Sequence, residues 1–189
     1  MSNAQSAATA RTFLDAGIAA SQGNDSTRAL GLFAQASEAL PGWALPHFLS
    51  GSEYAALGQW EKAEAELANA VLLAPDLHLA RYQLGLLQFS TGRAAVALVT
   101  WERLAGNPEE PSLSAFVRGF AALAQDAFPE ALASFERGLA EPRVNPAVAG
   151  DIRKVVQKLL AEVPSVTVTE AAPVDAHVLV ANYARLKLH

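Results

Sequence analysis

Glycine recurs along this chain at one fixed interval. One set of four glycines is equally spaced, at Gly17, Gly51, Gly85 and Gly119. Alanine keeps the same step, at Ala29, Ala63, Ala97 and Ala131. A constant interval of this length is typical of an array of repeated structural units, each of which packs mainly on its neighbours. The chain is therefore expected to be such an array.

Other positions of the repeating unit also recur in chemical type. If the glycine is position 8, the units cover residues 10–43, 44–77, 78–111 and 112–145. Position 24 is large and apolar every time, as Phe33, Leu67, Trp101 and Phe135. Position 15 tolerates a tight turn every time, as Asn24, Gly58, Gly92 and Asp126. Proline closes the first three units, at Pro41, Pro75 and Pro108.

These positions predict two helices in each unit, separated by a short turn. A small residue at position 8 lets the first helix approach the second closely, and the alanine at position 20 receives that approach. We expect the large position 24 to fill the space between neighbouring hairpins. Proline then ends the second helix, because it cannot continue the hydrogen-bond ladder.

This pattern resembles the tetratricopeptide repeat, and the second unit is most similar to it. The matching residues of that unit are Gly51, Tyr54, Gly58, Trp60, Ala63, Leu67, Ala70 and Pro75. Position 4 departs from the family's large apolar residue in three units, as His47, Arg81 and Ala115. The resemblance covers residues 10–145 and implies an all-α fold, a right-handed α-solenoid of about four helical hairpins.

Two further segments follow the repeats. Asn145 is an N-cap residue and is followed by a proline, and apolar and polar residues then alternate at helical spacing, which predicts a half-polar capping helix over 146–163. Residues 164–189 are expected to form a linker and an amphipathic tail, with a tail helix from Val174 to His189. Such a tail could dock on the repeats of its own chain or on a second copy.

The composition narrows the classes of function. The chain is 51% hydrophobic and only 17% charged, so it has enough apolar surface for a core. Its net charge of −5 disfavours a nucleic-acid partner. The sequence contains no run of about 18 apolar residues, which a membrane-spanning helix requires. A cytoplasmic location is expected, or a periplasmic one if a signal peptide has been removed.

The sequence contains no residue pattern typical of catalysis or of cofactor binding. The four histidines lack metal-ligand spacing, and none of the glycines precedes a Lys-Ser or Lys-Thr pair. Gly51-Ser52 has no glycine two residues later, which a nucleophile elbow requires. Glu109 and Glu110 are expected to be solvated in a proline-rich loop. We therefore expect no enzyme, no metal site and no cofactor.

The resemblance implies where a partner would bind. In this family the first helices line a concave groove, chiefly through unit positions 2, 5, 9 and 12. Here those positions are mostly apolar or aromatic: Leu14, Ile18, Leu45, Phe48, Leu79, Tyr82, Leu86, Phe89, Leu113, Phe116, Phe120 and Leu123. The lysine and asparagine of the family's carboxylate-gripping variant are absent from positions 5 and 9. The same twelve side chains could instead fill the core, because a one-residue register error rotates a helix by about 100°.

These observations favour a protein–protein interaction module, a scaffold, adaptor or chaperone-like protein. Its partner would be a protein or peptide that places an apolar helical or extended segment in the groove. The alternative is a self-assembling structural module whose groove is closed by its own tail or by a second copy, as a homodimer. The mass of the particle in solution separates these two hypotheses.

Overall fold

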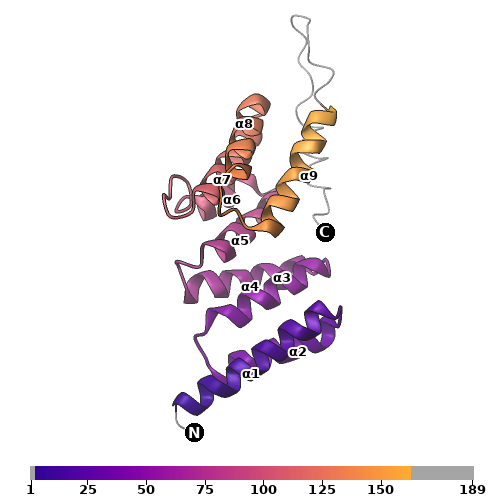
Figure 1. The fold of residues 1–189 in the computed structure, drawn as a ribbon, viewed down its shortest axis with the longest axis vertical. Coiled ribbons are helices and arrows are strands. Elements are labelled where there is room, and N and C mark those ends of the chain that lie inside the picture. Colours follow the sequence, from indigo (N-terminus) through magenta and orange to yellow (C-terminus); the bar gives the residue numbers. More distant parts are fainter. Residues whose placement is uncertain (1–2, 163–189) are drawn as a thin grey trace, which may run out of the picture. The chain divides into compact units, whose positions relative to one another are not determined.

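A computed structural model describes residues 3–162, and every regular element among them is an α-helix (Figure 1). The helices are α1 (Asn3–Gln22), α2 (Ser26–Ala39), α3 (Ala44–Ala56), α4 (Trp60–Leu73), α5 (His78–Ser90), α6 (Ala94–Trp101), α7 (Pro111–Leu123), α8 (Phe128–Leu139) and α9 (Pro146–Glu162). The first eight follow one another as four helix–turn–helix pairs, here called hairpins, and α9 follows them. The expected all-α class is confirmed. The predicted linker and tail, residues 164–189, lie outside the described residues.

The chain divides into two compact units, one ending at Leu87 and the other beginning at Gln88. The first unit contains α1 to α4 and most of α5. The second contains the end of α5 and helices α6 to α9. The two units are described separately below.

The turns inside the four hairpins share one backbone conformation. Position 15 has a positive φ in each, at 60° for Asn24, 70° for Gly58, 81° for Gly92 and 57° for Asp126. Glycine, asparagine and aspartate are the residues that enter this left-handed region at least cost. The residue types at position 15 therefore follow from the turn that joins the two helices.

The recurring glycine lets the two helices of a hairpin touch. A Cβ atom added to Gly17 would lie 2.6 Å from the ring of Phe33, and one on Gly51 would lie 2.7 Å from Leu67. Position 24 is expected between neighbouring hairpins, and at Phe33, Leu67 and Phe135 it also lies against the glycine of its own hairpin. The physical reason is that glycine leaves a depression in the first helix, which a large side chain of the second helix fills. Trp101 of α6 additionally stacks on Phe120 of the next hairpin, with ring centroids 5.3 Å apart.

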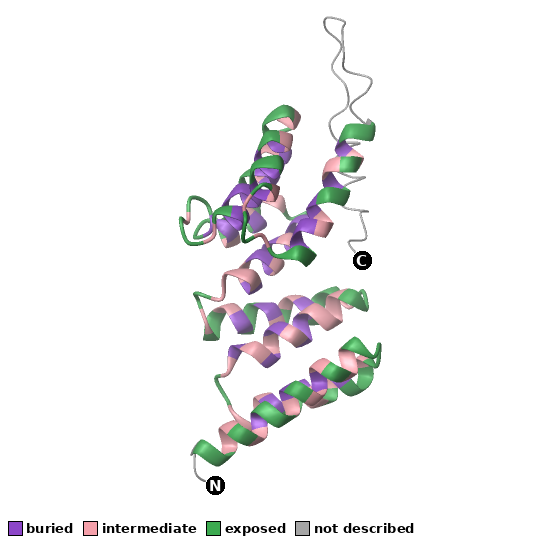
Figure 2. Cartoon of the chain, in the orientation of Figure 1, coloured by how far each residue is buried: buried purple, intermediate pink, exposed green. Residues whose placement is uncertain are grey.

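The first unit has two connected cores, formed by buried faces of its helices (Figure 2). One core joins α1 and α2 through Leu14, Ala29, Phe33 and Ala36. The other joins α3, α4 and α5 through Phe48, Ala63, Leu67, Ala70, Ala80, Leu84 and Leu87. Leu45 and Leu49 of α3 pack against both cores. Hairpin one is thereby fixed to hairpin two by apolar burial, worth about 1.5–3 kcal/mol for each large side chain.

Helix α9 packs one face and exposes the other, as expected for a helix at the end of a repeat array. Asn145 caps it, because its Oδ1 atom accepts hydrogen bonds from the N–H groups of Ala147 and Val148, at 3.0 and 3.2 Å. Its buried face consists of Val148, Ala149, Ile152, Val155 and Leu159. The sequence predicted this helix over 146–163, and the described helix ends at Glu162.

Candidate functional site

The twelve predicted groove residues fall into two groups by burial. Eight are buried, namely Leu14, Phe48, Tyr82, Phe89, Leu113, Phe116, Phe120 and Leu123. Four are half-buried, namely Ile18, Leu45, Leu79 and Leu86. Only the half-buried group offers surface to a partner in this conformation.

All four residues at position 5 are buried. Phe116 is fully buried, and its ring lies directly against the Cα of Gly138 on α8, where a Cβ atom would overlap it. Leu14 and Phe48 belong to the cores of their own hairpins. In hairpins one, two and four, position 5 therefore packs in a core to which the second helix of the same hairpin contributes.

In the second unit, the predicted groove residues contribute to an aromatic cluster. The ring of Phe120 lies 5.2 Å from Phe89, 5.3 Å from Trp101 and 5.1 Å from Phe135, measured between centroids. Leu113 and Leu123 are 4% and 5% exposed. Offset and edge-on ring pairs of this kind add about 0.5–1.5 kcal/mol beyond the burial of their area.

The half-buried residues of the first unit define what we call the first-helix surface. It consists of the partly accessible side chains at positions 2, 9 and 12: Ile18, Ser21, Leu45, Ser52, Ala55, Leu79 and Leu86. Positions seven apart, such as Leu79 and Leu86, share one face of a helix. The surface therefore follows α1, α3 and α5.

Two hydrogen bonds join successive first helices beside this surface. The Ser21 hydroxyl of α1 donates to Oε2 of Glu53 on α3 at 2.6 Å. The Ser52 hydroxyl of α3 donates to Oε1 of Gln83 on α5 at 2.7 Å. The polar groups of these pairs thus have partners within the protein.

Glu61, Glu64 and Glu66 of α4 form a group of acidic residues that could contact a partner. His47 of α3 lies 2.7 Å from Glu66, so one of the three is paired within the second hairpin. Among residues 3–162, no three histidine or acidic side chains are grouped as a metal site would require. None of the helices described is both long and apolar enough to cross a bilayer.

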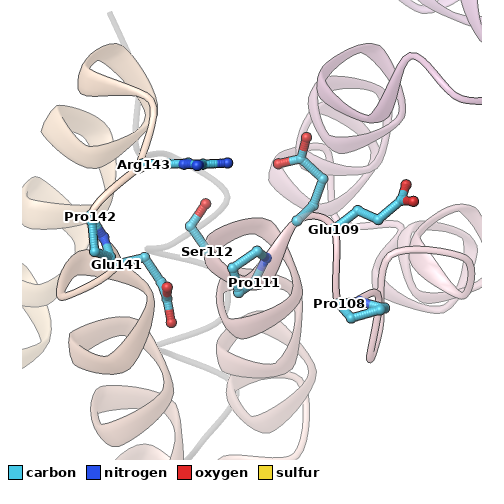
Figure 3. Close-up of a pocket in the computed structure, with 8 residues that line it drawn as sticks. Pro108, Glu109, Pro111, Ser112, Glu141, Pro142 and Arg143 are labelled. Atoms are coloured by element: carbon cyan, nitrogen blue, oxygen red, sulfur yellow. The ribbon is translucent and has the colours of Figure 1, made fainter.

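Sequence reasoning missed two adjoining clefts in the second unit. The larger, of about 270 Å³, is lined by Pro108, Glu109, Glu110, Pro111, Ser112, Glu141, Pro142 and Arg143 (Figure 3). The smaller, of about 210 Å³, is lined by Gly106, Asn107, Pro111, Ser114, Ala115, Arg118, Arg137 and Glu141. Both form where the α6–α7 loop and the α8–α9 loop meet the start of α7. The signal in the sequence was the concentration of prolines and charges in the two loops.

Comparisons with known proteins identify the fold. No family model matches the chain, and neither does any curated protein. A crystal structure of MamA is 20% identical, covering 69% of this chain and 76% of that chain with a TM-score of 0.59. MamA 41-end from Desulfovibrio magneticus RS-1 is 15% identical, covering 94% and 96% with a TM-score of 0.59.

A third similar structure is YrrB, described as a TPR protein with an unusual peptide-binding site. It is 17% identical, covers 91% of this chain and 82% of that chain, and has a TM-score of 0.56. The chain has the tetratricopeptide-repeat fold. The resemblance expected from the sequence is confirmed at this level, and identities this low establish the fold alone.

Proposed function

We propose that this tetratricopeptide-fold chain is a protein-interaction module that acts by binding. Its first-helix surface receives an apolar helical or extended segment of a partner protein. Support comes from the fold, which it shares with a peptide-binding protein, and from the accessible apolar side chains on α1, α3 and α5.

The observation that carries the proposal is the partial exposure of Ile18, Leu45, Leu79 and Leu86. The position-5 side chains of the same helices are buried, so these four leucine and isoleucine side chains form an apolar layer above a completed core. Covering them removes apolar area from water, and each methylene group buried contributes about 0.8 kcal/mol.

The neighbouring polar groups favour an apolar occupant too. A buried hydroxyl or carboxylate without a partner destabilises a complex by about 1–3 kcal/mol or more. Ser21 and Glu53 are already paired, as are Ser52 and Gln83. A partner can therefore cover the two serine hydroxyls without supplying hydrogen bonds to them.

Selection from a displayed library of random peptides on the full chain tests this function. We expect enriched peptides to carry apolar residues at helical or alternating spacing. Substituting Leu86→Ser or Ile18→Ser should weaken their binding at least tenfold. Leu72→Ser is the matched control, because Leu72 is 77% exposed on the second helix α4, outside the first-helix surface.

Amide chemical shifts of the unsubstituted chain provide a second measurement. An enriched peptide should shift the amides of α1, α3 and α5 and leave those of α2 unchanged. Peptides that bind elsewhere, or equally well to both surface variants, would refute the proposal. A particle mass of two chains that falls to one with Leu86→Ser would favour self-assembly instead.

A further inference from the structure

The larger cleft of the second unit lies apart in sequence from the first-helix surface, and none of its residues serves the proposed function. Its walls come from the α6–α7 loop, the first turn of α7 and the α8–α9 loop. Three of its lining residues are prolines, Pro108, Pro111 and Pro142. Because proline fixes φ, these walls lose little conformational freedom when a ligand binds.

Ser112 provides an unused hydrogen-bonding group inside the cleft. Only 6% of the residue is exposed, although it lines the cleft. Its hydroxyl has no hydrogen-bond partner within residues 3–162. A nearly buried hydroxyl that opens only into a cleft is satisfied by water or by a ligand.

Arg143 provides an unpaired positive charge beside this hydroxyl. Its side chain and that of Ser112 converge on the same space, whereas Glu109 and Glu141 extend away from it (Figure 3). The guanidinium makes no ion pair with any described residue. Arginine presents a planar set of donors that matches the two oxygens of a carboxylate.

The first turn of α7 adds two backbone donors at this end of the cleft. The opening N–H groups of a helix have no intrahelical acceptor and attract negative charge. Glu110, the N-cap residue, gives them no side-chain hydrogen bond. The N–H group of Ser114 donates to the carbonyl of Glu110, at 2.9 Å. The N–H groups of Ser112 and Leu113 are therefore the two that can donate to a ligand.

We propose that this cleft binds the carboxylate of an acidic side chain, Asp or Glu, in a partner protein. One oxygen accepts from Arg143, and the other accepts from the Ser112 hydroxyl and the first turn of α7. The larger cleft is itself lined by three carboxylates, those of Glu109, Glu110 and Glu141, and Arg118 and Arg137 of the adjoining smaller cleft offset part of their charge. A phosphate dianion is repelled more strongly by the nearby glutamates.

Nuclear magnetic resonance of the full chain, titrated with N-acetyl-glutamate N-methylamide, tests the proposal. We expect saturable shifts of the Ser112 and Leu113 amide signals and of the Arg143 Nε–H signal. N-acetyl-glutamine N-methylamide, which has the same shape without the charge, should shift none of them. Equal shifts with this neutral probe, tighter binding of inorganic phosphate, or no saturation would each overturn the proposal.

Substitutions give an independent measure of the same site. Arg143→Gln and Ser112→Ala should each lower the affinity for the acidic probe, Arg143→Gln by about tenfold. Arg103→Gln is the matched control, because Arg103 is an exposed arginine of the α6–α7 connection that lines neither cleft. Glu110→Gln should raise the affinity by about two- to threefold at low salt, because it removes one repelling charge.

An unchanged affinity in Arg143→Gln, or an equal loss in Arg103→Gln, would overturn the assignment of the carboxylate to this cleft. These outcomes are independent of Leu86→Ser and Ile18→Ser, which alter only the first-helix surface. Failure of the carboxylate site can thus be distinguished from failure of the proposed function.

Discussion

Phe135 of α8 lies against the backbone of Gly119 on α7, so closely that a Cβ atom there would come within 2.5 Å of its ring. The opposite relationship holds one turn away, where Phe116 of α7 lies against Gly138 of α8. The two aromatic rings thus point in opposite directions across one hairpin, each filling the depression left by a glycine.

Gly119→Ala is expected to destabilise the chain by about 1–3 kcal/mol, because the added methyl group overpacks the hairpin. Urea denaturation followed by circular dichroism measures the change. Gly31→Ala is the control: Gly31 is exposed in α2, and a Cβ atom there would meet nothing within 4 Å. We expect that variant to be more stable by about 0.5–1 kcal/mol, since alanine favours a helix over glycine. Equal effects of the two substitutions would contradict the close contact.

Phe116→Ser should lower the free energy of unfolding by about 3–5 kcal/mol or more, a large fraction of the stability of a typical domain. The residue is fully buried, and serine leaves both a cavity and an unpaired hydroxyl. Ile18→Ser, at a half-buried position, should cost less than half as much. Thermal denaturation of both variants checks this difference. A soluble Phe116→Ser protein with an unchanged melting temperature would show that Phe116 is surface after all.

The Ser21–Glu53 hydrogen bond is expected to couple hairpins one and two by about 0.5–1.5 kcal/mol. A double-mutant cycle with Ser21→Ala and Glu53→Ala measures this coupling free energy, because each substitution removes one partner of the hydrogen bond. Ser37 offers a comparison, because its hydroxyl bonds only to the carbonyl of Phe33 within its own helix. Additive effects of Ser21→Ala and Glu53→Ala would mean that the hydrogen bond contributes nothing between the hairpins.

Salt should separate the two proposed binding sites. The Debye length falls from about 10 Å at 0.1 M to about 3 Å at 1 M, which weakens attraction between exposed charges. Binding of an apolar peptide to the first-helix surface should change little over this range, whereas the acidic probe should lose affinity at Arg143. If peptide affinity collapses with salt, binding at the acidic residues Glu61, Glu64 and Glu66 would explain it better.

The hairpins could be predicted from the sequence because their signals recur in every unit. Glycine at position 8, alanine at position 20 and the turn residue at position 15 each have one local physical role, and that role is the same in every hairpin. The four left-handed turns at Asn24, Gly58, Gly92 and Asp126 show how directly residue type follows backbone conformation.

The burial of position 5 could also have been inferred from the sequence. Residues three apart lie on the same helix face, so Phe116 must point in the direction of Gly119. Since glycine at position 8 faces the second helix, position 5 faces it as well. The family resemblance predicts a groove at position 5, whereas the local geometry of the hairpin predicts burial there.

The larger cleft, in contrast, had no periodic signal. Glu109 and Glu110 belong to the loop before α7, whereas Glu141 and Arg143 belong to the loop after α8. These residues meet only because α7 and α8 return the chain to the same end of the hairpin. Their approach depends on tertiary structure, and neither loop alone indicates a ligand.

The close pairing of neighbouring helices has a consequence for the order of folding. Phe33 of α2 finds its place against Gly17 of the helix just before it, and the core of hairpin one requires no residue from the second unit. Contacts this local form rapidly, and domains fold from the N-terminus while synthesis continues. The first hairpin can therefore form on the ribosome once α2 has emerged, before the residues of the larger cleft have been translated.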